Sequence, residues 1–253
     1  MATSDAPDES GIPPATIEEL IRASDAHDCS EGSGVCVKIA AIADLPTRFG
    51  RFQVVAFSSP SDRKEHAALI RGNIVGREGV PVRLHSECLT GDTLGSLRCD
   101  CRDQLEVALK EIAKGETGII LYLRQEGRGI GFANKIRAYQ LQERGLDTVQ
   151  ANLALGFRPD ERDYEVAAHM LESLNVRSIQ LMSNNPDKIN DLRYHGVRVD
   201  GRIPIVTPPN AFNRRYLETK RLKFGQLLEQ PPLEEVPEQV DSAGPNLSES
   251  DPA

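Results

Sequence analysis

The chain has 253 residues, a formal net charge of −8 and a hydrophobic content of 39%, which suffices for a substantial core in one large or two small domains. No stretch approaches about 18 consecutive apolar residues, and the start MATSDAPDESG has neither the basic nor the apolar part of a secretory signal; we therefore expect no membrane partner and a cytoplasmic location. Five Cys, three of them clustered, suit a reducing compartment with a metal site better than a disulfide scaffold.

Acidic residues gather at both ends of the chain. Residues 1–35 hold eight Asp or Glu and one Arg, and residues 229–253 hold seven acidic residues and no Lys or Arg. Because each end carries −7 and the whole chain −8, residues 36–228 carry +6. This pattern predicts a disordered acidic leader over 1–35, a folded domain over 36–228 that binds an anionic ligand, and a disordered acidic tail over 229–253. Dispersed Lys and Arg without an aromatic–basic run argue against nucleic acid as a partner.

The first part of the folded region has the pattern of short strands. Apolar segments at 36–43, 51–58, 66–74 and 80–86 are separated by turns rich in Pro, Gly and Asp. They predict a mostly antiparallel β part.

From Asp103 onward, amphipathic segments alternate with apolar runs. Helices are predicted at 104–113, 133–144, 161–174 and 187–196, and strands at 117–124, 178–183 and 197–206. The whole pattern predicts an α/β fold (α+β mixed), in which an antiparallel β part is followed by alternating helices and strands. Ligands gather beyond the carboxyl ends of strands in such sheets, and the polar clusters of this chain fall there.

Three cysteines stand close together in the run HSECLTGDTLGSLRCDC, at Cys88, Cys99 and Cys101. Three thiolates are one ligand short of a closed tetrahedron, and a catalytic zinc site keeps its fourth position open for water. An iron–sulfur cluster usually takes a fourth Cys, so the spacing favours zinc. The same spacing also fits buried apolar thiols or disulfide partners.

A glycine-rich loop, RQEGRGIG at 124–131, lies between a predicted strand and a predicted helix. Its backbone amides, the helix N-terminus and the guanidinium groups of Arg124 and Arg128 would suit a phosphate group. Such a loop can also do nothing more than turn a strand into a helix.

Two further polar clusters have two interpretations each. FRPDERDYE places Asp160 and Arg162 at a predicted helix start, where Asp160 or Asp163 can simply cap the helix. SNNPDK at 183–188 follows a predicted strand, and its Asn and Pro can be pure turn chemistry.

Six motifs then occur in one order along the chain: VRLHSECLTGDTLGSLRCDC, LRQEGRGIG, NKIRAYQLQ, LGFRPDERDY, SNNPDK and YLETKRLKFGQLL. Through them, over about residues 38–228, the chain resembles GTP cyclohydrolase II. The resemblance implies that 36–228 is the catalytic domain of a zinc-dependent enzyme that opens the imidazole ring of GTP and releases formate and pyrophosphate. The product would be 2,5-diamino-6-(5-phosphoribosylamino)pyrimidin-4(3H)-one, formed in the first step of riboflavin biosynthesis.

The resemblance also assigns roles to residues. It implies that the three cysteines hold one Zn2+ per subunit, that Mg2+ accompanies the triphosphate, and that the enzyme is a homodimer. It implies catalytic roles for Tyr139, Asp160 and Arg162. Contacts to GTP are implied for Arg83, Leu84, His85, Ser86, Glu87, Gln104, Glu126, Gly127, Arg128, Thr148, Ser183 and Lys188.

The chemistry of Arg162 and Glu126 bears on the roles that the resemblance implies for them. Family similarity makes Arg162 a nucleophile toward the α-phosphorus with Asp160 as its proton acceptor, but a guanidinium has a pKa above about 12 and no free lone pair, so a phosphate clamp is the simpler role. Glu126 carries a carboxylate that matches the N1–H and N2–H2 edge of guanine, so it is our hypothesis for base specificity.

Two alternatives stay open at this point. The chain can be a divergent paralogue that acts on a related nucleotide or stops at the formamide stage, which the yield of formate from GTP would reveal. It can also be a non-catalytic zinc- and GTP-binding module, which would bind GTP without turnover.

Overall fold

A mixed sheet of seven strands organises the part of the chain that the computed structural model describes, residues 17–25, 36–60 and 63–227. The strand order is β1-β2-β3-β5-β4-β6-β7. The strands are β1 (Lys38–Thr47), β2 (Gly50–Ser59), β3 (Lys64–Arg71), β4 (Val80–Ser86), β5 (Gly118–Leu123), β6 (Ile179–Met182) and β7 (Val199–Ile203).

The sheet has an antiparallel half and a parallel half. Strands β1, β2, β3 and β5 pair antiparallel, whereas β5, β4, β6 and β7 pair parallel. The predicted fold class, with antiparallel strands followed by alternating helices and strands, is confirmed. The strand predicted over 66–74 ends earlier, at Arg71, because Gly72 turns the chain with a φ of +65° and passes so close to Glu116 that an added Cβ would lie 2.0 Å from its carbonyl oxygen.

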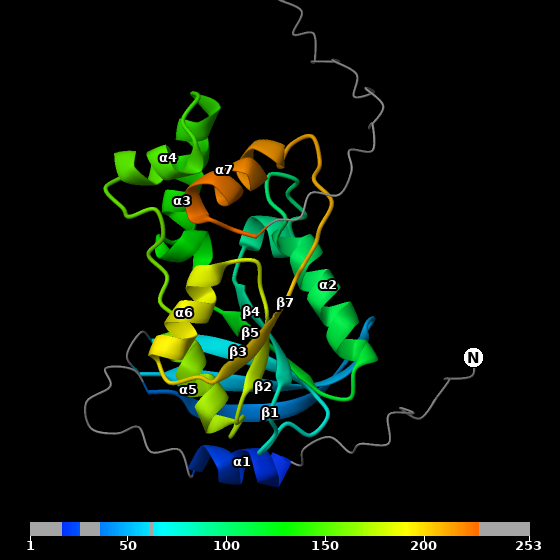
Figure 1. Cartoon of the computed structure of the whole chain (residues 1–253). Helices are drawn as coiled ribbons and strands as arrows, with labels where there is room; N and C mark the ends of the chain where they lie inside the picture. Colours follow the sequence, from blue (N-terminus) through cyan, green and yellow to red (C-terminus); the bar gives the residue numbers. More distant parts are fainter. Residues whose placement is uncertain (1–16, 26–35, 61–62, 228–253) are drawn as a thin grey trace, which may run out of the picture.

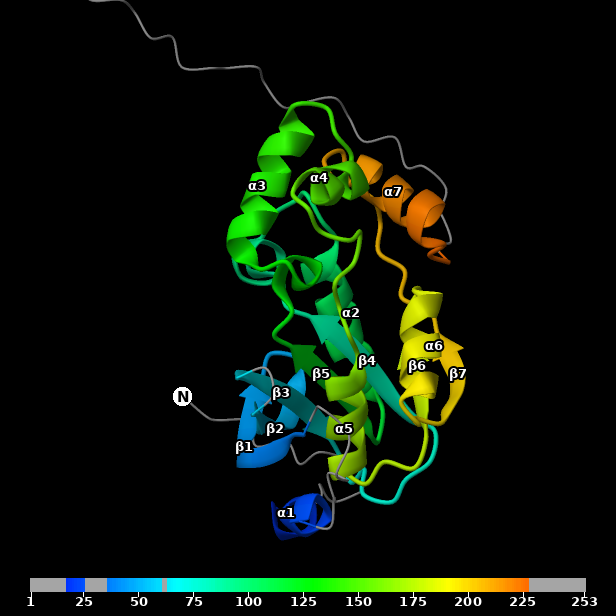
Figure 2. The same ribbon diagram turned by 90° about the vertical axis from the view of Figure 1, so that its left-hand side faces the viewer.

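Helices lie on both faces of the sheet and at both of its ends (Figures 1 and 2). Figures 1 and 2 show α3, α4 and α7 gathered beyond one end of the sheet and α1 at the opposite end. The helices are α1 (Ile17–Asp25), α2 (Cys101–Lys114), α3 (Phe132–Glu143), α4 (Thr148–Ala154), α5 (Glu165–Ser173), α6 (Pro186–Tyr194) and α7 (Arg214–Phe224). None of the described helices combines the length and the apolar character needed to cross a membrane.

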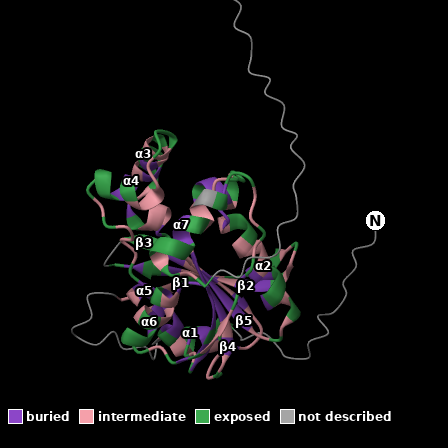
Figure 3. Cartoon of the chain, turned by 45° about the horizontal axis from the view of Figure 1, so that its top comes forward, coloured by how far each residue is buried: buried purple, intermediate pink, exposed green. Residues whose placement is uncertain are grey.

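The central strand β5 shows how the sheet is buried from both sides. Ile119, Leu121 and Leu123 face the larger core with α1, α5 and α6, while Ile120 faces the smaller core under α2. Successive side chains point to opposite faces of a strand, so a continuous apolar run such as GIILYL fits a strand covered on both faces. Figure 3 shows the buried residues along the strands and the exposed ones on the outer helix surfaces.

The predicted disordered leader is wrong for residues 17–25. These residues form α1, and the side chain of Leu20 is fully buried in the larger core. Leu20 packs there, while Ile17 and Ile21 are exposed. The acidic composition of the segment predicted disorder and gave no sign of this helix. The rest of the leader and the tail at 229–253 lie outside the described residues.

The helix predicted over 161–174 is wrong at its start. Helix α5 begins at Glu165, and residues 161–164 have no regular structure. Tyr164 is the N-cap of α5 and makes no side-chain cap hydrogen bond, while Asp163 accepts the backbone N–H of Glu165 at 2.6 Å. Asp160 is therefore free to pair with another residue. Helices α4 and α7 were not predicted.

Candidate active site

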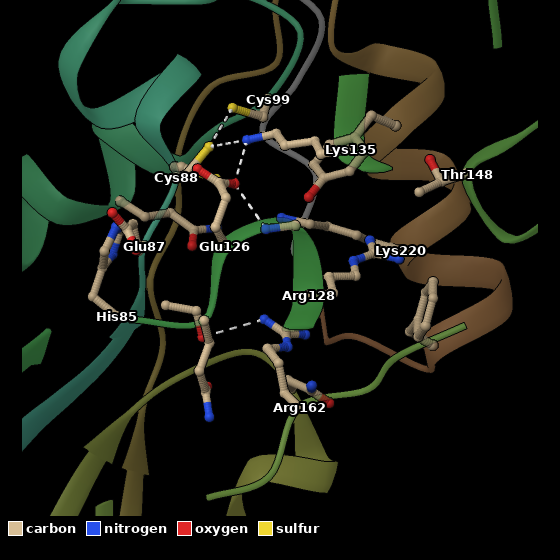
Figure 4. A pocket seen from close by; sticks show the side chains of 18 of the residues that line it. His85, Glu87, Cys88, Cys99, Glu126, Arg128, Lys135, Thr148, Arg162 and Lys220 are labelled. Atoms are coloured by element: carbon tan, nitrogen blue, oxygen red, sulfur yellow. Dashed lines mark hydrogen bonds and ion pairs between the residues drawn. The ribbon is translucent and has the colours of Figure 1, made fainter. Parts of the chain in front are cut away.

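A pocket lies where strands β4 and β5 end, bounded by α3, α4 and α7 (Figures 1 and 4). Seven Lys or Arg side chains line it, against two carboxylates, Glu87 and Glu126. The cations are Arg83, Arg98, Arg128, Lys135, Arg162, Lys188 and Lys220. A cleft with this excess of positive charge attracts a polyanion.

The three predicted cysteines converge at one end of this pocket. Cys88 follows β4, while Cys99 and Cys101 stand at the start of α2. Their sulfur atoms all lie within 4.8 Å of one another, and the sulfurs of Cys88 and Cys99 are 3.8 Å apart. Two sulfurs bound to one tetrahedral zinc at about 2.3 Å each lie about 3.8 Å apart. The donor set therefore fits a zinc ion with one coordination position left for another ligand.

Gly91 permits the close approach of these sulfurs. A Cβ on Gly91 would lie 2.8 Å from the sulfur of Cys99 and 3.1 Å from that of Cys88. The backbone N–H of Gly91 also donates to the sulfur of Cys88 at 3.4 Å. No larger residue fits here without displacing a metal ligand.

The charge state of the thiols points to a cation. Hydrogen bonds with Cys101 and Cys99 lower the pKa of Cys88 far below its usual value, whereas hydrogen bonds with Cys88 and Cys99, together with burial, raise the pKa of Cys101 well above it. Three sulfurs this close cannot all ionise unless a cation binds between them. A cation bound between the sulfurs would therefore favour the ionised form of all three.

Lys135 and Glu126 extend the cluster into the pocket, as Figure 4 shows. The ammonium of Lys135 donates to the sulfur of Cys88 at 3.1 Å and to Glu126 at 2.8 Å. Glu126 also accepts the backbone N–H groups of Gly127 at 2.7 Å and Leu89 at 2.6 Å. Both carboxylate oxygens of Glu126 thus accept hydrogen bonds from the protein.

His85 and Asp92 support the loop that carries Cys88. His85 Nε2 lies 3.0 Å from both oxygens of Asp92, and Asp92 also accepts the backbone N–H of Cys88 at 3.0 Å and the hydroxyl of Tyr122 at 2.9 Å. Contacts of this kind would hold the thiol of Cys88 in the orientation that a metal needs. His85 lines the pocket, but its Nε2 holds the loop.

Tyr139 stands on α3 next to the sulfurs. Its hydroxyl lies 3.5 Å from that of Thr90, and the guanidinium of Arg98 lies 4.2 Å from its ring centroid. Burial raises the pKa of Tyr139, so the hydroxyl keeps its proton at neutral pH. The residue can therefore donate a hydrogen bond at the metal end of the pocket.

Asp160 and Arg162 form an ion pair at the other end. Arg162 Nε donates to Asp160 at 2.8 Å, and the Arg162 Nη1 lies 3.5 Å from the hydroxyl of Ser86. Burial opposes the charge on Arg162, but Tyr164 and Asp160 raise its pKa above the usual range. The guanidinium keeps its proton and acts as a fixed cation.

Two more cations reach the pocket, Arg83 from β4 and Lys188 from α6. Arg83 donates to Gln104 at 2.7 Å and to the carbonyl of Met182 at 3.0 Å. Lys188 donates to the carbonyl of Leu84 at 2.9 Å, and burial, together with Arg83, holds the pKa of Lys188 well below its usual range. An anion in the pocket would favour the charged form of Lys188.

The structure gathers most of the predicted residues. The three cysteines and Tyr139, Arg162, Arg83, His85, Ser86, Glu87, Gln104, Glu126, Gly127, Arg128, Thr148, Ser183 and Lys188 all line the pocket. Leu84 does not line the pocket: its side chain is fully buried in the larger core, and its carbonyl accepts a hydrogen bond from Lys188. Asp160 acts behind Arg162 rather than in the lining.

Three functional candidates escaped the sequence analysis: Asp92, Lys135 and Lys220. Asp92 follows Cys88 by four residues, and Lys135 precedes Tyr139 by four on one helix, a spacing that puts both on one face. Lys220 lies in YLETKRLKFGQLL, and only the fold brings it to Asp100, at 2.6 Å.

The thiol cluster and the cationic pocket together fit the class of proteins that bind a metal and an anionic ligand in one site. Comparison with known proteins gives the family. The family model "GTP cyclohydrolase II" matches residues 38–204, and the chain belongs to this family.

Curated relatives with high sequence identity support the same family. A GTP cyclohydrolase-2 of Picrophilus torridus is 53% identical over 185 residues, which cover 73% of this chain and 96% of the relative, and one of Haemophilus influenzae is 49% identical over 193 residues, 76% and 89% of the two chains. The riboflavin biosynthesis protein RibBA of Endomicrobium trichonymphae is 52% identical over 185 residues, 73% of this chain and 46% of the longer protein.

Proposed function

We propose that the chain hydrolyses GTP at the first step of riboflavin biosynthesis. The guanine imidazole ring opens, formate and pyrophosphate leave, and 2,5-diamino-6-(5-phosphoribosylamino)pyrimidin-4(3H)-one remains. One observation carries the proposal: three converging sulfurs stand at one end of a pocket whose remaining walls carry Arg83, Arg128, Arg162 and Lys188. In a purine triphosphate, the base would lie at the sulfur end of the pocket and the anionic phosphate chain along the Arg and Lys side chains.

The proposed metal is one Zn2+ held by Cys88, Cys99 and Cys101. The soft thiolate set and the sulfur separation of 3.8 Å support zinc. When bound, the metal supplies a Lewis acid that activates water for attack on the purine ring. Mg2+ is proposed to arrive with the triphosphate and to neutralise part of its charge.

At the metal end, the chain's own groups orient the base and handle protons. Lys135 balances part of the thiolate charge through its contact with Cys88. Tyr139, protonated and within 3.5 Å of Thr90, can donate a hydrogen bond to a ring nitrogen as the ring opens.

At the phosphate end, we propose that Arg162 binds the α-phosphate as a cation. The raised pKa of Arg162 and its ion pair with Asp160 support a role as a phosphate-binding cation rather than as a nucleophile. A guanidinium that holds its proton has no lone pair with which to attack phosphorus. Asp160 then orients the guanidinium. A trapped phosphoramidate on Arg162 would establish the covalent route instead.

Two further expectations belong to the proposal. A homodimer is proposed from the resemblance, and a cytoplasmic location from the sequence features given above. Sedimentation of the full chain tests the first, and fractionation of the source cells tests the second.

The testing experiment measures two products together. Purified, zinc-loaded protein is incubated with GTP and Mg2+, and formate and pyrophosphate are quantified over time. Equal yields support the proposal. Pyrophosphate without formate would indicate arrest at the formamide stage, activity only on another nucleotide would indicate a paralogue, and GTP binding without products would indicate a binding module; each contradicts it.

A further inference from the structure

Helix α7 forms a wall of the pocket although it lies beyond residues 38–204, which the family model matches. Tyr216, Lys220 and Phe224 of this helix line the pocket together with Arg128 and Arg162. Figure 4 shows Lys220 of this helix and Arg128 in the same pocket. The helix thus brings an aromatic surface and a cation to the site from the end of the described chain.

The guanidinium of Arg128 stacks on this aromatic surface. Its Cζ lies 4.3 Å from the ring centroid of Phe224 and 5.7 Å from that of Tyr216. A cation over an aromatic face within about 6 Å is attracted to the ring. These aromatic rings offer the guanidinium no hydrogen-bond acceptor, so its N–H groups need other partners.

The described residues leave one nitrogen of this guanidinium without an acceptor. Nη1 of Arg128 is buried and has no hydrogen-bond partner among the described residues. A buried guanidinium N–H without a partner is costly, and Arg128 lies near enough to Asp160 to help lower the pKa of that carboxyl. An acceptor in the pocket beside the Asp160–Arg162 pair would satisfy Nη1.

The backbone of Arg128 is held in an uncommon conformation as well. Its φ is +59°, in the left-handed region, and its carbonyl accepts the backbone N–H of Glu161 at 3.0 Å. Strained residues persist where the surrounding structure over-determines them, often at ligand sites. The loop and α7 together fix where the guanidinium points.

A buried ion pair fixes α7 itself. Lys220 donates to Asp100 at 2.6 Å, and the Asp100 side chain is fully buried. Asp100 also accepts from Gln104, whose other side-chain atom accepts from Arg83. The position of α7 is thereby linked to the residue between two of the metal-binding cysteines and to a second cation of the pocket.

We propose that Phe224 is a positioning residue for phosphate binding: its ring holds the guanidinium of Arg128 so that the unpaired N–H groups face the phosphate oxygens of the substrate. The inference rests on the proposed function for the identity of the triphosphate. Its content is separate, namely that α7 acts through Arg128.

A double-mutant cycle on the full-length, zinc-loaded protein tests the proposal. Phe224→Leu removes the ring and keeps an apolar side chain, Phe224→Tyr restores a ring, and Arg128→Ala removes the guanidinium. Leu222→Ala, at a position on α7 that is 64% exposed and outside the pocket lining, is the matched control. The probe is pyrophosphate, titrated by calorimetry, with KM and kcat for GTP and the melting temperature as further readouts.

The expected result is that Phe224→Leu raises the dissociation constant of pyrophosphate about fivefold to thirtyfold, with KM for GTP rising in step and kcat changing less. Phe224→Tyr and Leu222→Ala bind as the parent does. In the Arg128→Ala background, Phe224→Leu has less than about a twofold further effect, because the two residues act as one unit.

Other outcomes overturn the proposal. Unchanged binding in Phe224→Leu, or an equal loss with and without Arg128, would show that α7 does not act through this guanidinium. If Phe224→Tyr lowers the melting temperature and weakens pyrophosphate binding as much as Phe224→Leu does, the role of Phe224 is purely structural. Pyrophosphate binding is measured without turnover, so a parent protein that binds pyrophosphate but makes no formate would contradict the proposed function and leave this inference standing.

Discussion

The ammonium of Lys135 lies 3.1 Å from the sulfur of Cys88. The same nitrogen lies 2.8 Å from Glu126, so a carboxylate, a cation and a thiol follow one another from the glycine-rich loop to the metal end of the pocket. Zinc with three thiolates carries a net charge of about −1, which an adjacent ammonium offsets. Lys135 is therefore expected to support the proposed metal site, although it would not be a ligand.

Lys135→Met is expected to weaken zinc binding about tenfold or more, as loss of second-shell partners usually does. Competition with a chromogenic chelator measures the affinity. Lys135→Arg should retain most of it, and Lys110→Met, at a lysine whose side chain is 57% exposed, serves as the control. Parent-like zinc affinity in Lys135→Met would remove Lys135 from the site.

Gly91→Ala is expected to expel the metal. Its Cβ would lie 2.8 Å from the sulfur of Cys99, and overpacking of this kind costs about 1–3 kcal/mol. Zinc content and urea unfolding measure the two effects. Gly201→Ala, where an added Cβ meets nothing within 4 Å, should keep full zinc content. A zinc-replete Gly91→Ala protein would contradict the tight packing described here.

Tyr139→Phe is expected to slow formate release about 100-fold, the usual scale for a lost proton donor, while pyrophosphate release continues. The ratio of formate to pyrophosphate is the measurement. Tyr194→Phe, at a side chain that is 85% exposed, should keep the ratio at one. Equal slowing of both products in Tyr139→Phe would place the hydroxyl in substrate binding instead.

Asp160→Asn is expected to change how the free energy of unfolding depends on pH in the acidic range. Burial would raise the pKa of Asp160, but the contacts with Arg162 outweigh it and lower the pKa below its ordinary value. A carboxyl with a lowered folded-state pKa stabilises the protein fully above its unfolded pKa of about 4 and loses this contribution as the pH falls through the folded value. Urea unfolding of parent and variant from pH 7 to pH 3 measures the difference. It should be constant above about pH 5 and shrink below about pH 4; a constant difference to pH 3 would contradict the assignment.

The sequence predicts those parts of the molecule that local patterns encode. Alternating and continuous apolar runs predicted all seven strands, and the spacing of Cys88, Cys99 and Cys101 predicted a three-sulfur cluster that the fold does assemble. The alternation of a strand and the spacing of nearby ligands both lie within a short stretch of sequence, so one sequence is enough to recognise them.

The remaining features depend on tertiary contacts. Helix α1 is held by one buried side chain, Leu20, against the larger core, and composition alone points the other way. Asp160 looked like a helix cap, but its partner is Arg162. Lys220 meets Asp100 across 120 positions of sequence, and no local pattern predicts such a pair.

The central claim, a metal held by three cysteine sulfurs with one position open, is tested most directly by zinc K-edge X-ray absorption on protein that releases formate from GTP. The account predicts about one zinc per chain with three sulfur neighbours at about 2.3 Å and one lighter neighbour. Active protein without zinc, or zinc with four sulfurs or none, would contradict it.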